Sequence, residues 1–472
     1  MKTIFLIKGE IDRIFLILFL VINLLVLVNN VLHNPVVGYD GTEHLKYIRV
    51  LPYRLPDTAD TREFFSAPLP YVFPSLIDKA CLRSKPVNSG SIAIDNCLIF
   101  AGKFAQLINF VLSLGVTFCV GSIARIMQPE SRWGKISALA LLGVLTVYYK
   151  TFTQVRGEPY LILFTAWTLY LVARMIQAPE QVTWRSGLKL GVVIGLALLS
   201  RQWGFMLLPA LIGLFALVWL LDSHWGREWA KAMTVAALVA FLICGWFYLS
   251  LYIRYGTFMA FNRTPLVFSF SNQPSTFYRN TGLKNLLLFK SPIRGTFNNQ
   301  LFPILYSDTW GDYWGHFVFI QDRSYLGEMG YGNIQQITPY LGRVNAVSMY
   351  PSLIFLVGML TGVFYSTKLV KGDAGERRRA LLNIFLLFYL IVSFSLYVVF
   401  LNMYPLLDQG DTIKATYMLH VLVVLPILGA EFLEGLRARS PKAYLVSLAL
   451  LGLVFAHNLP AMITRYKIFS IP

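Results

Sequence analysis

Long apolar runs recur along the whole chain, separated by short polar connections. Each run is about 18 residues or longer, which is enough to cross the hydrocarbon core of a bilayer as an α-helix. The runs do not alternate between apolar and polar residues, as the strands of a membrane barrel must. The pattern predicts an all-α polytopic bundle of about 11 spans, forming one integral membrane domain over residues 1–472. The expected spans are 12–32, 97–125, 134–152, 159–177, 187–203, 205–222, 231–253, 346–367, 380–401, 414–435 and 442–458.

Basic residues gather in every second connection between the expected spans. Arg125, Arg174, Arg227 and Arg377 are examples from four such connections. By the positive-inside rule these connections and the N-terminus are cytoplasmic. The opposite side then holds two long loops, residues 33–96 and 254–345, which we expect to pack on the bundle as an extracytoplasmic cap.

The composition is typical of a membrane protein and bears on the kind of partner and substrate that it binds. Of 472 residues 56% are hydrophobic and only 14% are charged, whereas a soluble protein carries about a quarter charged residues. The net charge of +17 lies in short connections, which fits topology and anionic lipid headgroups and does not indicate nucleic acid as a partner. No Gly-rich phosphate loop occurs. We therefore expect an activated substrate to arrive through the membrane lipids.

The first long loop carries the clearest candidate chemistry. Asp40, Glu43 and His44 are three and four residues apart, so on a short helix they would share a face. A carboxylate in that position can take the proton of an attacking hydroxyl group. The alternative is that Asp40 only caps the helix that follows it. The three side chains are also suitable ligand types for a divalent metal ion, although the spacing is no specific signature.

The same loop resembles that of a known superfamily. Tyr39-Asp40, Glu43-His44, Leu55-Pro56, and Glu63 followed by Ala67-Pro68-Leu69-Pro70-Tyr71 resemble the first loop of the GT-C glycosyltransferases that use polyprenyl-phosphate sugars. Relatives include protein O-mannosyltransferases and lipid A aminoarabinose transferases. The resemblance implies inverting transfer of a monosaccharide to an extracytoplasmic hydroxyl on a lipid, glycan or protein. Many relatives have two adjacent acids, but Gly41 follows Asp40 here, so Asp40 and Glu43 both stay candidates for the catalytic acid.

Three basic residues are candidates for binding the donor phosphate. Arg201 follows the run GLALLS at the outer edge of the expected fifth span, where the resemblance implies a phosphate contact. A guanidinium can pair two phosphate oxygens. Lys414 stands at the mouth of a span in a segment that resembles the family's Lys-x-x-x-Tyr run, and Lys103 lies near the start of the second span. For each, anchoring of a helix end or snorkelling to the headgroups is the alternative.

Further residues are expected to bind substrate. The second long loop contains the sequence DTWGDYWGH, in which aromatic faces and carboxylates suit sugar rings and their hydroxyls, unless it is an interfacial aromatic belt. The short connection with Arg156 and Glu158 faces the same side, and a simple surface ion pair is its alternative. The candidates for substrate binding are His44, Glu63, Glu158, Asp308, Trp310, Asp312 and Tyr417.

The sequence as a whole predicts a membrane glycosyltransferase whose partners are a polyprenyl-phosphate-sugar donor, membrane lipids and a hydroxyl acceptor. No cofactor is expected apart from the divalent metal ion considered above. The alternatives are a transporter or flippase of lipid-linked sugars, which the lack of an internal repeat weakens, and a non-catalytic partner subunit. We expect the bacterial inner membrane as the location. Cys81 and Cys97 flank the end of the first loop, and a disulfide between them is left open.

Overall fold

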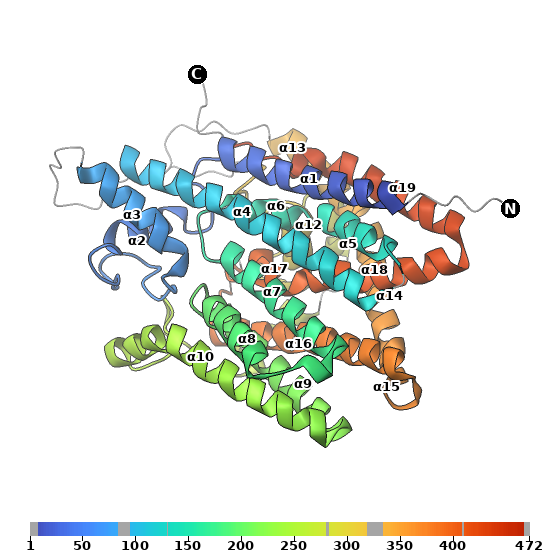
Figure 1. Cartoon of the computed structure of the whole chain (residues 1–472). Coiled ribbons are helices and arrows are strands. Elements are labelled where there is room, and N and C mark those ends of the chain that lie inside the picture. Colours follow the sequence, from blue (N-terminus) through green and yellow to red (C-terminus); the bar gives the residue numbers. More distant parts are fainter. Residues whose placement is uncertain are drawn as a thin grey trace.

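The computed structural model describes residues 8–83, 95–129, 131–279, 283–318, 334–407 and 410–466. Within these ranges the regular structure is helical and no strand occurs, which confirms the predicted all-α fold. Figure 1 shows the long helices side by side in one bundle. The long helices are α1 (Lys8–Leu32), α4 (Asn96–Met127), α7 (Glu158–Gln177), α9 (Leu207–Leu221), α10 (Ser223–Tyr255), α14 (Met349–Ser366), α16 (Ala374–Met403) and α19 (Pro441–Asn458).

Among the described residues, eight helices are long and apolar enough to cross a membrane, and ten are if two bent pairs each count as one span. The pairs are α5 (Trp133–Gly143) with α6 (Thr146–Thr153), bent by 69°, and α17 (Ala415–Leu422) with α18 (Val424–Arg439), bent by 45°. The expected span 187–203 falls on α8 (Trp184–Leu198), whose 15 residues rise only about 22 Å, short of a hydrocarbon core of about 30 Å. The count of 11 therefore stays a prediction.

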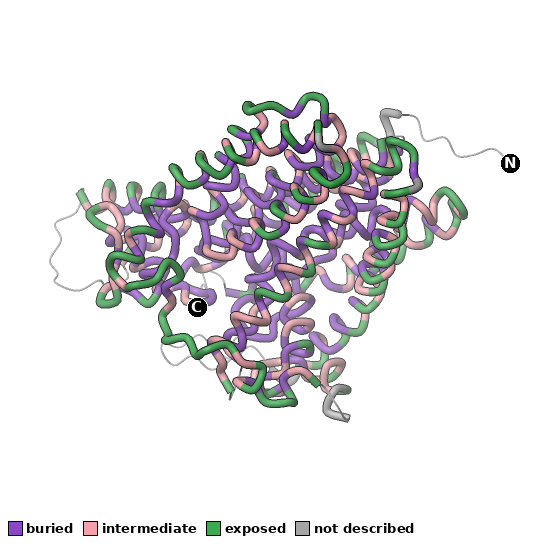
Figure 2. The backbone as a smooth tube through the Cα atoms, turned by 90° about the horizontal axis from the view of Figure 1, so that it is seen from below, coloured by how far each residue is buried: buried purple, intermediate pink, exposed green. Residues whose placement is uncertain are grey.

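The interior of the bundle is buried and its margin is exposed, as Figure 2 shows in purple and green. Large apolar side chains such as Leu220 and Ile253 are 81% and 74% exposed. In water so much exposed apolar surface would be unfavourable, whereas acyl chains accept it. The surface thus supports an integral membrane protein.

Small residues bring α8 and α10 into close contact. A Cβ atom added to Gly187 would lie 2.1 Å from the carbonyl oxygen of Ala232, and one added to Gly191 would lie 2.6 Å from that of Ala236. Glycine at one face of a membrane helix allows such backbone approach. The close packing holds α8 against α10, and Arg201 follows three residues after the end of α8.

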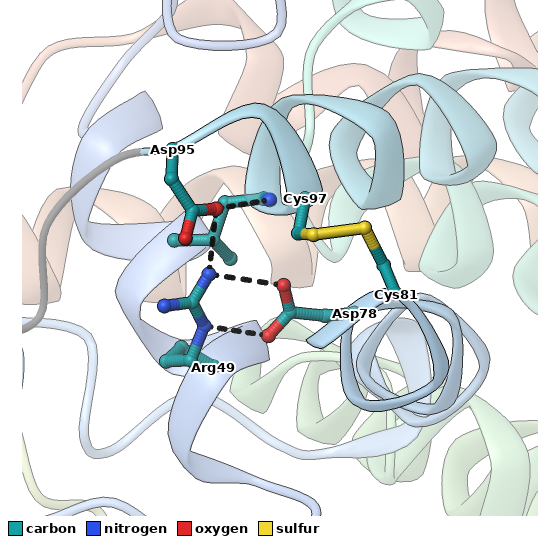
Figure 3. Close-up of a disulfide and its surroundings, with 6 residues drawn as sticks. Arg49, Asp78, Cys81, Asp95 and Cys97 are labelled. Carbon is teal, nitrogen blue, oxygen red and sulfur yellow. Dashed lines mark hydrogen bonds and ion pairs between the residues drawn. A yellow bond between two sulfur atoms is a disulfide. The ribbon is translucent and has the colours of Figure 1, made fainter. Parts of the chain in front are cut away.

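The first long loop folds into two helices that a disulfide joins to the bundle. They are α2 (Gly41–Val50) and α3 (Leu69–Arg83), and Cys81 of α3 is bonded to Cys97 of α4. Beside the disulfide, the Arg49 guanidinium lies between the carboxylates of Asp78 and Asp95 (Figure 3), with nitrogen–oxygen distances of 2.6 and 2.8 Å. These bonds tie α2, α3 and the start of α4 together.

The second long loop also contains helices, so the range 254–345 is not irregular throughout. In it lie α11 (Ser275–Tyr278), α12 (Leu301–Trp310), and the start of a helix that reaches beyond it, α13 (Ile334–Val347). The helix α12 packs on α6 and α17. The remaining short elements are η1 (Pro179–Gln181), η2 (Gln202–Met206), η3 (Phe270–Asn272), η4 (Leu283–Phe289), α15 (Lys368–Lys371) and η6 (Leu459–Ala461).

Candidate active site

A polar cavity of about 510 Å³ opens beside the start of α2, and we call it the acidic cavity. Residues from both long loops and from the segment before α17 form its wall. They are Val36, Gly38, Tyr39, Asp40, Gly41, Thr42, Glu43, Arg62, Arg294, Trp314, His316, Asp411 and Lys414. Parts of the chain that are far apart in sequence thus meet around Asp40.

Asp40 is held in an unusual conformation and is not used as a helix cap. Its φ of 55° and ψ of 30° lie in the left-handed region, which non-glycine residues rarely adopt. The turn is tight, because a Cβ atom on the neighbouring Gly41 would lie 2.5 Å from the carbonyl oxygen of Val36. The carboxylate makes no capping hydrogen bond, so the capping alternative fails. Backbone strain of this kind is typical of functional positions.

The Asp40 carboxylate faces Lys414. Its Oδ2 lies 3.6 Å from the Lys414 Nζ, and the two side chains are 37% and 14% exposed. The ammonium also lies over the rings of Tyr39 and Tyr417, 5.0 and 5.5 Å from their centroids. Burial opposes the charge, but Tyr417 and Asp40 outweigh it and raise the pKa of Lys414 above its usual value. The lysine is therefore a stable cation at the wall of the cavity.

The side chains of Glu43 and His44 bond to residues other than Asp40. The Glu43 carboxylate accepts hydrogen bonds from the Thr61 hydroxyl and the Arg62 N–H, at 3.0 and 2.8 Å, and it pairs with Lys46. Glu43 thus fastens the following loop, although it also borders the cavity. His44 is fully buried, with Nδ1 2.8 Å from the Tyr71 hydroxyl.

The metal-ligand hypothesis is not supported by this geometry. The side chains of Asp40, Glu43 and His44 diverge, and no group of three His, Cys, Asp or Glu residues that could hold a metal ion occurs in the described ranges. Burial lowers the pKa of His44 to about 4, partly opposed by the nearby Glu63 carboxylate. The imidazole is therefore neutral at pH 7, and Glu63, 3.8 Å from Nδ1, is its nearest carboxylate.

A buried ionic network lies behind the cavity. Arg201 pairs with both Glu63 and Glu158, at 2.8 and 3.0 Å, and Arg156 pairs with Glu158 at 2.5 Å. Ser66 donates its hydroxyl to Glu63 and accepts from Arg201. All four charged side chains are at most 5% exposed. Two arginines and two glutamates balance each other, as burial of charge requires.

The network connects the two sides of the site. The Arg156 guanidinium lies over the rings of Tyr39 and Tyr417, 5.3 and 5.5 Å from their centroids, so it is next to the Lys414 ammonium that contacts the same rings. Arg201 stands at the other end, where it borders a second cavity. A surface ion pair with Glu158 was the alternative that the sequence left open for Arg156, but the structure buries both side chains.

The second cavity is mostly apolar, and we call it the apolar groove. Its volume is about 390 Å³, and Trp203, Phe400 and other apolar side chains of η2, α16 and the segment after α10 line it. Arg201, Ser66 and Tyr417 are at its polar end. Tyr417 thus borders the apolar groove and contacts Lys414 of the acidic cavity.

Three residues of the second long loop that were expected to bind substrate, Asp308, Trp310 and Asp312, are buried in the protein. Asp308 is fully buried, pairs with Lys150, and accepts hydrogen bonds from the Tyr39 hydroxyl and the Ala415 N–H at 2.8 and 2.7 Å. Asp312 accepts from three backbone N–H groups of the turn that follows it. Trp310 is 2% exposed and stacks on Phe355. None of the three expected substrate contacts borders a cavity described above.

Lys103 is also placed away from both cavities. Its ammonium donates hydrogen bonds to the carbonyl oxygens of Asn30, Val31 and His33 at the end of α1. These are the carbonyls that a helix leaves without intrahelical partners. The structure therefore gives Lys103 the helix-anchoring role that was its alternative.

Several residues of the site escaped the sequence analysis. Lys150 is the single charged residue between Lys135 and Arg156 in an apolar run, and that isolation was the signal for a buried pair. Arg62 and Arg294 line the acidic cavity but stand in loops with no distinguishing pattern. Trp314 and His316 were in the predicted aromatic patch, and these two members of it do reach the cavity wall.

One segment of the chain matches a known protein family. Residues 92–247 match the family model of the dolichyl-phosphate-mannose-protein mannosyltransferases. The matched segment includes Glu158 and Arg201 but neither Asp40 nor Lys414. The match, which covers part of the chain, agrees with the resemblance predicted from the sequence. A search among curated proteins gives no match.

Among solved structures, the chain is similar to the oligosaccharyltransferase AglB from Archaeoglobus fulgidus in complex with an inhibitory peptide and a dolichol-phosphate, with 12% identity and a TM-score of 0.49 over 95% of this chain and 56% of that one. It is also similar to ArnT from Cupriavidus metallidurans, with 14% identity and a TM-score of 0.39 over 90% of this chain and 79% of that one. The chain thus spans about half the length of the oligosaccharyltransferase.

Proposed function

We propose that the protein moves a monosaccharide from a polyprenyl-phosphate carrier to a hydroxyl group of a lipid, glycan or protein, with inversion at the anomeric carbon. The donor class is supported by the matched family, whose name specifies a dolichyl-phosphate sugar. The observation that carries the proposal is the Asp40 carboxylate, which borders a polar cavity, faces Lys414 and lies near an apolar groove.

In this proposal the lipid chain of the donor lies in the apolar groove and its sugar lies in the acidic cavity. The phosphate then stands where the two meet, next to Tyr417 and Lys414, whose ring centroid and Nζ are 5.5 Å apart. A groove lined by Trp203 and Phe400 suits methylene and methyl groups. The polar cavity offers the hydrogen-bonding groups that a sugar needs.

The reaction follows from this placement. The acceptor oxygen attacks the anomeric carbon from the side opposite the phosphate, and Asp40 takes the hydroxyl proton as the new bond forms. The bond between the anomeric carbon and the phosphate oxygen breaks, and its electron pair stays on the phosphate. Lys414 stabilises the negative charge that develops there.

Lys414 is a better candidate for the phosphate contact than Arg201. The Arg201 charge is already balanced by Glu63 and Glu158, and these two carboxylates would repel an added phosphate. Lys414 has one partially exposed carboxylate at 3.6 Å. We assign Arg201 a positioning role, because it joins the first loop to α7. Glu43 likewise positions the loop that carries Arg62.

The location of the site is part of the proposal. We place the N-terminus in the cytoplasm and the acidic cavity on the extracytoplasmic side of a bacterial inner membrane. The basic connections of the sequence support this orientation.

The experiment that tests the function uses the purified full-length chain in nanodiscs. A polyprenyl-phosphate donor with a radiolabelled sugar is supplied with total membrane glycolipids and glycoproteins as acceptors, and a nucleotide sugar with the same label serves as the control donor. We expect label to pass from the lipid donor only, with inverted anomeric configuration in the product. Label that crosses the bilayer of proteoliposomes without leaving its lipid would instead identify a flippase.

A further inference from the structure

A third cavity, here called the distal cavity, lies at the end of the bundle away from Asp40. It measures about 390 Å³ and is formed by the ends of α7 and α9, the starts of α10 and α16, and α15. In Figure 1, α15 stands at the right and α2 at the left. The first two turns of α16 border this cavity and its last two turns border the apolar groove, which separates the two by roughly 33 Å.

The carboxylates in the wall of the distal cavity are already used. Asp222 accepts hydrogen bonds from two backbone N–H groups at the start of α10, at 2.8 and 3.2 Å. Asp373 accepts from a backbone N–H at the start of α16 at 2.8 Å. Both are helix caps, and the helix N-terminus balances part of their charge.

The two arginines in the wall have little counter-charge. Arg377 donates its Nε to the carbonyl oxygen of Gly372 at 2.9 Å, which orients the guanidinium, and it pairs with no carboxylate of the described residues. Arg378 is 3.9 Å from a carboxylate of Glu180, which is itself 59% exposed. Its Nε is buried and has no hydrogen-bond partner among the described residues. The wall thus holds two guanidinium groups, whereas its two carboxylates serve as helix caps.

The remaining wall is apolar and aromatic. Val218, Leu221 and Leu381 line one part, and Trp225 and Trp229 line another. Trp229 is 2% exposed, and its indole N–H lacks an acceptor in the described part of the chain. Tryptophan is frequent at the membrane interface, where an apolar ring and a polar N–H meet different surroundings. A ligand that fits this wall needs acceptor oxygens, negative charge and an apolar part.

We propose that the distal cavity binds an anionic phospholipid, with the phosphate between Arg377 and Arg378 and the acyl chains along Val218 and Leu221 toward the bilayer. Basic pockets between membrane helices bind such headgroups on the cytoplasmic side. The positive-inside rule predicts that this end faces the cytoplasmic leaflet. Inorganic phosphate would satisfy the arginines but leave the apolar wall without a partner. The site is independent of the glycosyltransfer proposed above.

Native mass spectrometry of the full-length protein, released from detergent micelles, tests the proposal. The probes are phosphatidylglycerol, phosphatidylcholine and inorganic phosphate. We expect the protein to retain phosphatidylglycerol over phosphatidylcholine on the order of 10-fold, as two arginines at one headgroup imply. The variant Arg377→Gln/Arg378→Gln should lose that preference. The variant Arg185→Gln/Lys189→Gln removes the same charge from exposed residues at the same end, outside the cavity, and should keep it.

A second variant tests the apolar wall of the distal cavity while both arginines are kept. Leu381→Trp keeps both arginines but fills the cavity, so phosphatidylglycerol retention should fall toward that of the arginine variant. Gel-filtration elution at the wild-type volume shows that each variant is folded. The proposal is overturned if Arg377→Gln/Arg378→Gln retains phosphatidylglycerol as the wild type does. It is equally overturned if inorganic phosphate at millimolar concentration displaces the lipid from the wild type, because the apolar wall then contributes nothing.

Discussion

The two long loops both supply aspartates to the same end of the bundle, but the surroundings of these aspartates differ. In the first loop Asp40 is 37% exposed, lines a cavity and has one ion-pair partner, 3.6 Å away. In the second loop Asp308 is fully buried and bonded to Lys150, a tyrosine hydroxyl and a backbone N–H. A carboxylate that can react keeps free lone pairs and contact with solvent or substrate. A carboxylate whose acceptor sites are filled holds the scaffold.

The comparison also shows how the buried Asp308 helps to position Asp40. Tyr39 donates its hydroxyl to Asp308 and precedes Asp40 in the chain, so the buried aspartate fixes the turn that carries the exposed one. The ring of the same tyrosine lies below Lys414. The second loop thus contributes to the site by positioning residues of the first loop and not by the substrate contact that we expected of Asp308.

The largest expected effect comes from breaking the buried pair. Asp308→Ala leaves the Lys150 ammonium buried without a counter-charge, which costs about 3–5 kcal/mol. We expect the yield of monodisperse protein to fall severely. Asp411→Ala is the matched control, because Asp411 is 45% exposed in its pair with Arg294. Equal yields for the two variants, measured by fluorescence-detected gel filtration, would contradict the prediction that Asp308 stabilises the fold.

The next largest effect distinguishes Lys414 from Lys103, the two lysines that the sequence offered for the phosphate contact. Lys414→Gln should reduce transfer by on the order of 100-fold, because the charge on the departing phosphate loses its partner. The apparent melting temperature should stay close to that of the wild type. Lys103→Gln is the control: it removes bonds to the end of α1 and should lower the melting temperature while the folded enzyme keeps its transfer rate. The reverse pattern would return the phosphate contact to Lys103.

Removal of the disulfide tests how the first loop is held. Cys81 and Cys97 are 16 residues apart in sequence, and closing a loop of that size stabilises a protein by about 3 kcal/mol in the chain-entropy model. We expect Cys81→Ser/Cys97→Ser to have a lower melting temperature, while Arg49 still joins α2 to α3 through Asp78. Cys119→Ser, at a free buried cysteine of α4, is the control. An unchanged melting temperature in the double variant would contradict the prediction.

The smallest effect is a dependence of stability on pH. The pKa of His44 is lowered to about 4 in the folded protein by burial, so between pH 6.5 and 4 the unfolded chain binds more protons than the folded one. Stability contributed by neutral His44 is therefore full above about pH 6.5 and is lost as the pH falls toward 4. The loss amounts to roughly 2–3 kcal/mol.

Melting temperatures measured from pH 7.5 to 5 should show this decline in the wild type and a weaker one in His44→Gln. The pKa of Glu63, lowered to about 2 by Arg201 and His44 against the effect of burial, adds a further loss only below about pH 4.5. Parallel curves for the wild type and His44→Gln would show that His44 does not contribute.

The fold was largely accessible from the sequence, because apolar runs and basic connections follow directly from the needs of a bilayer. The number of spans could not be predicted in the same way, because α8 is shorter than its apolar run and two candidate spans are bent. In the site, Asp40 lies beside Lys414, and Arg201 pairs with Glu158. Their pairing did not follow from the sequence, because Glu63 and Arg201 are 138 residues apart and only folding joins them. The burial of Asp308 depended in the same way on Lys150.

The role of Asp40 is tested most directly by single-turnover transfer from a bound, radiolabelled polyprenyl-phosphate sugar in the variant Asp40→Asn. Donor binding is measured on the same preparation, and Asp57→Asn, an exposed aspartate of the same loop, serves as the control. We predict that Asp40→Asn binds the donor as the wild type does but transfers sugar at least 100-fold more slowly, because a general base contributes at least about 100-fold. Transfer by Asp40→Asn at the rate of Asp57→Asn would contradict it.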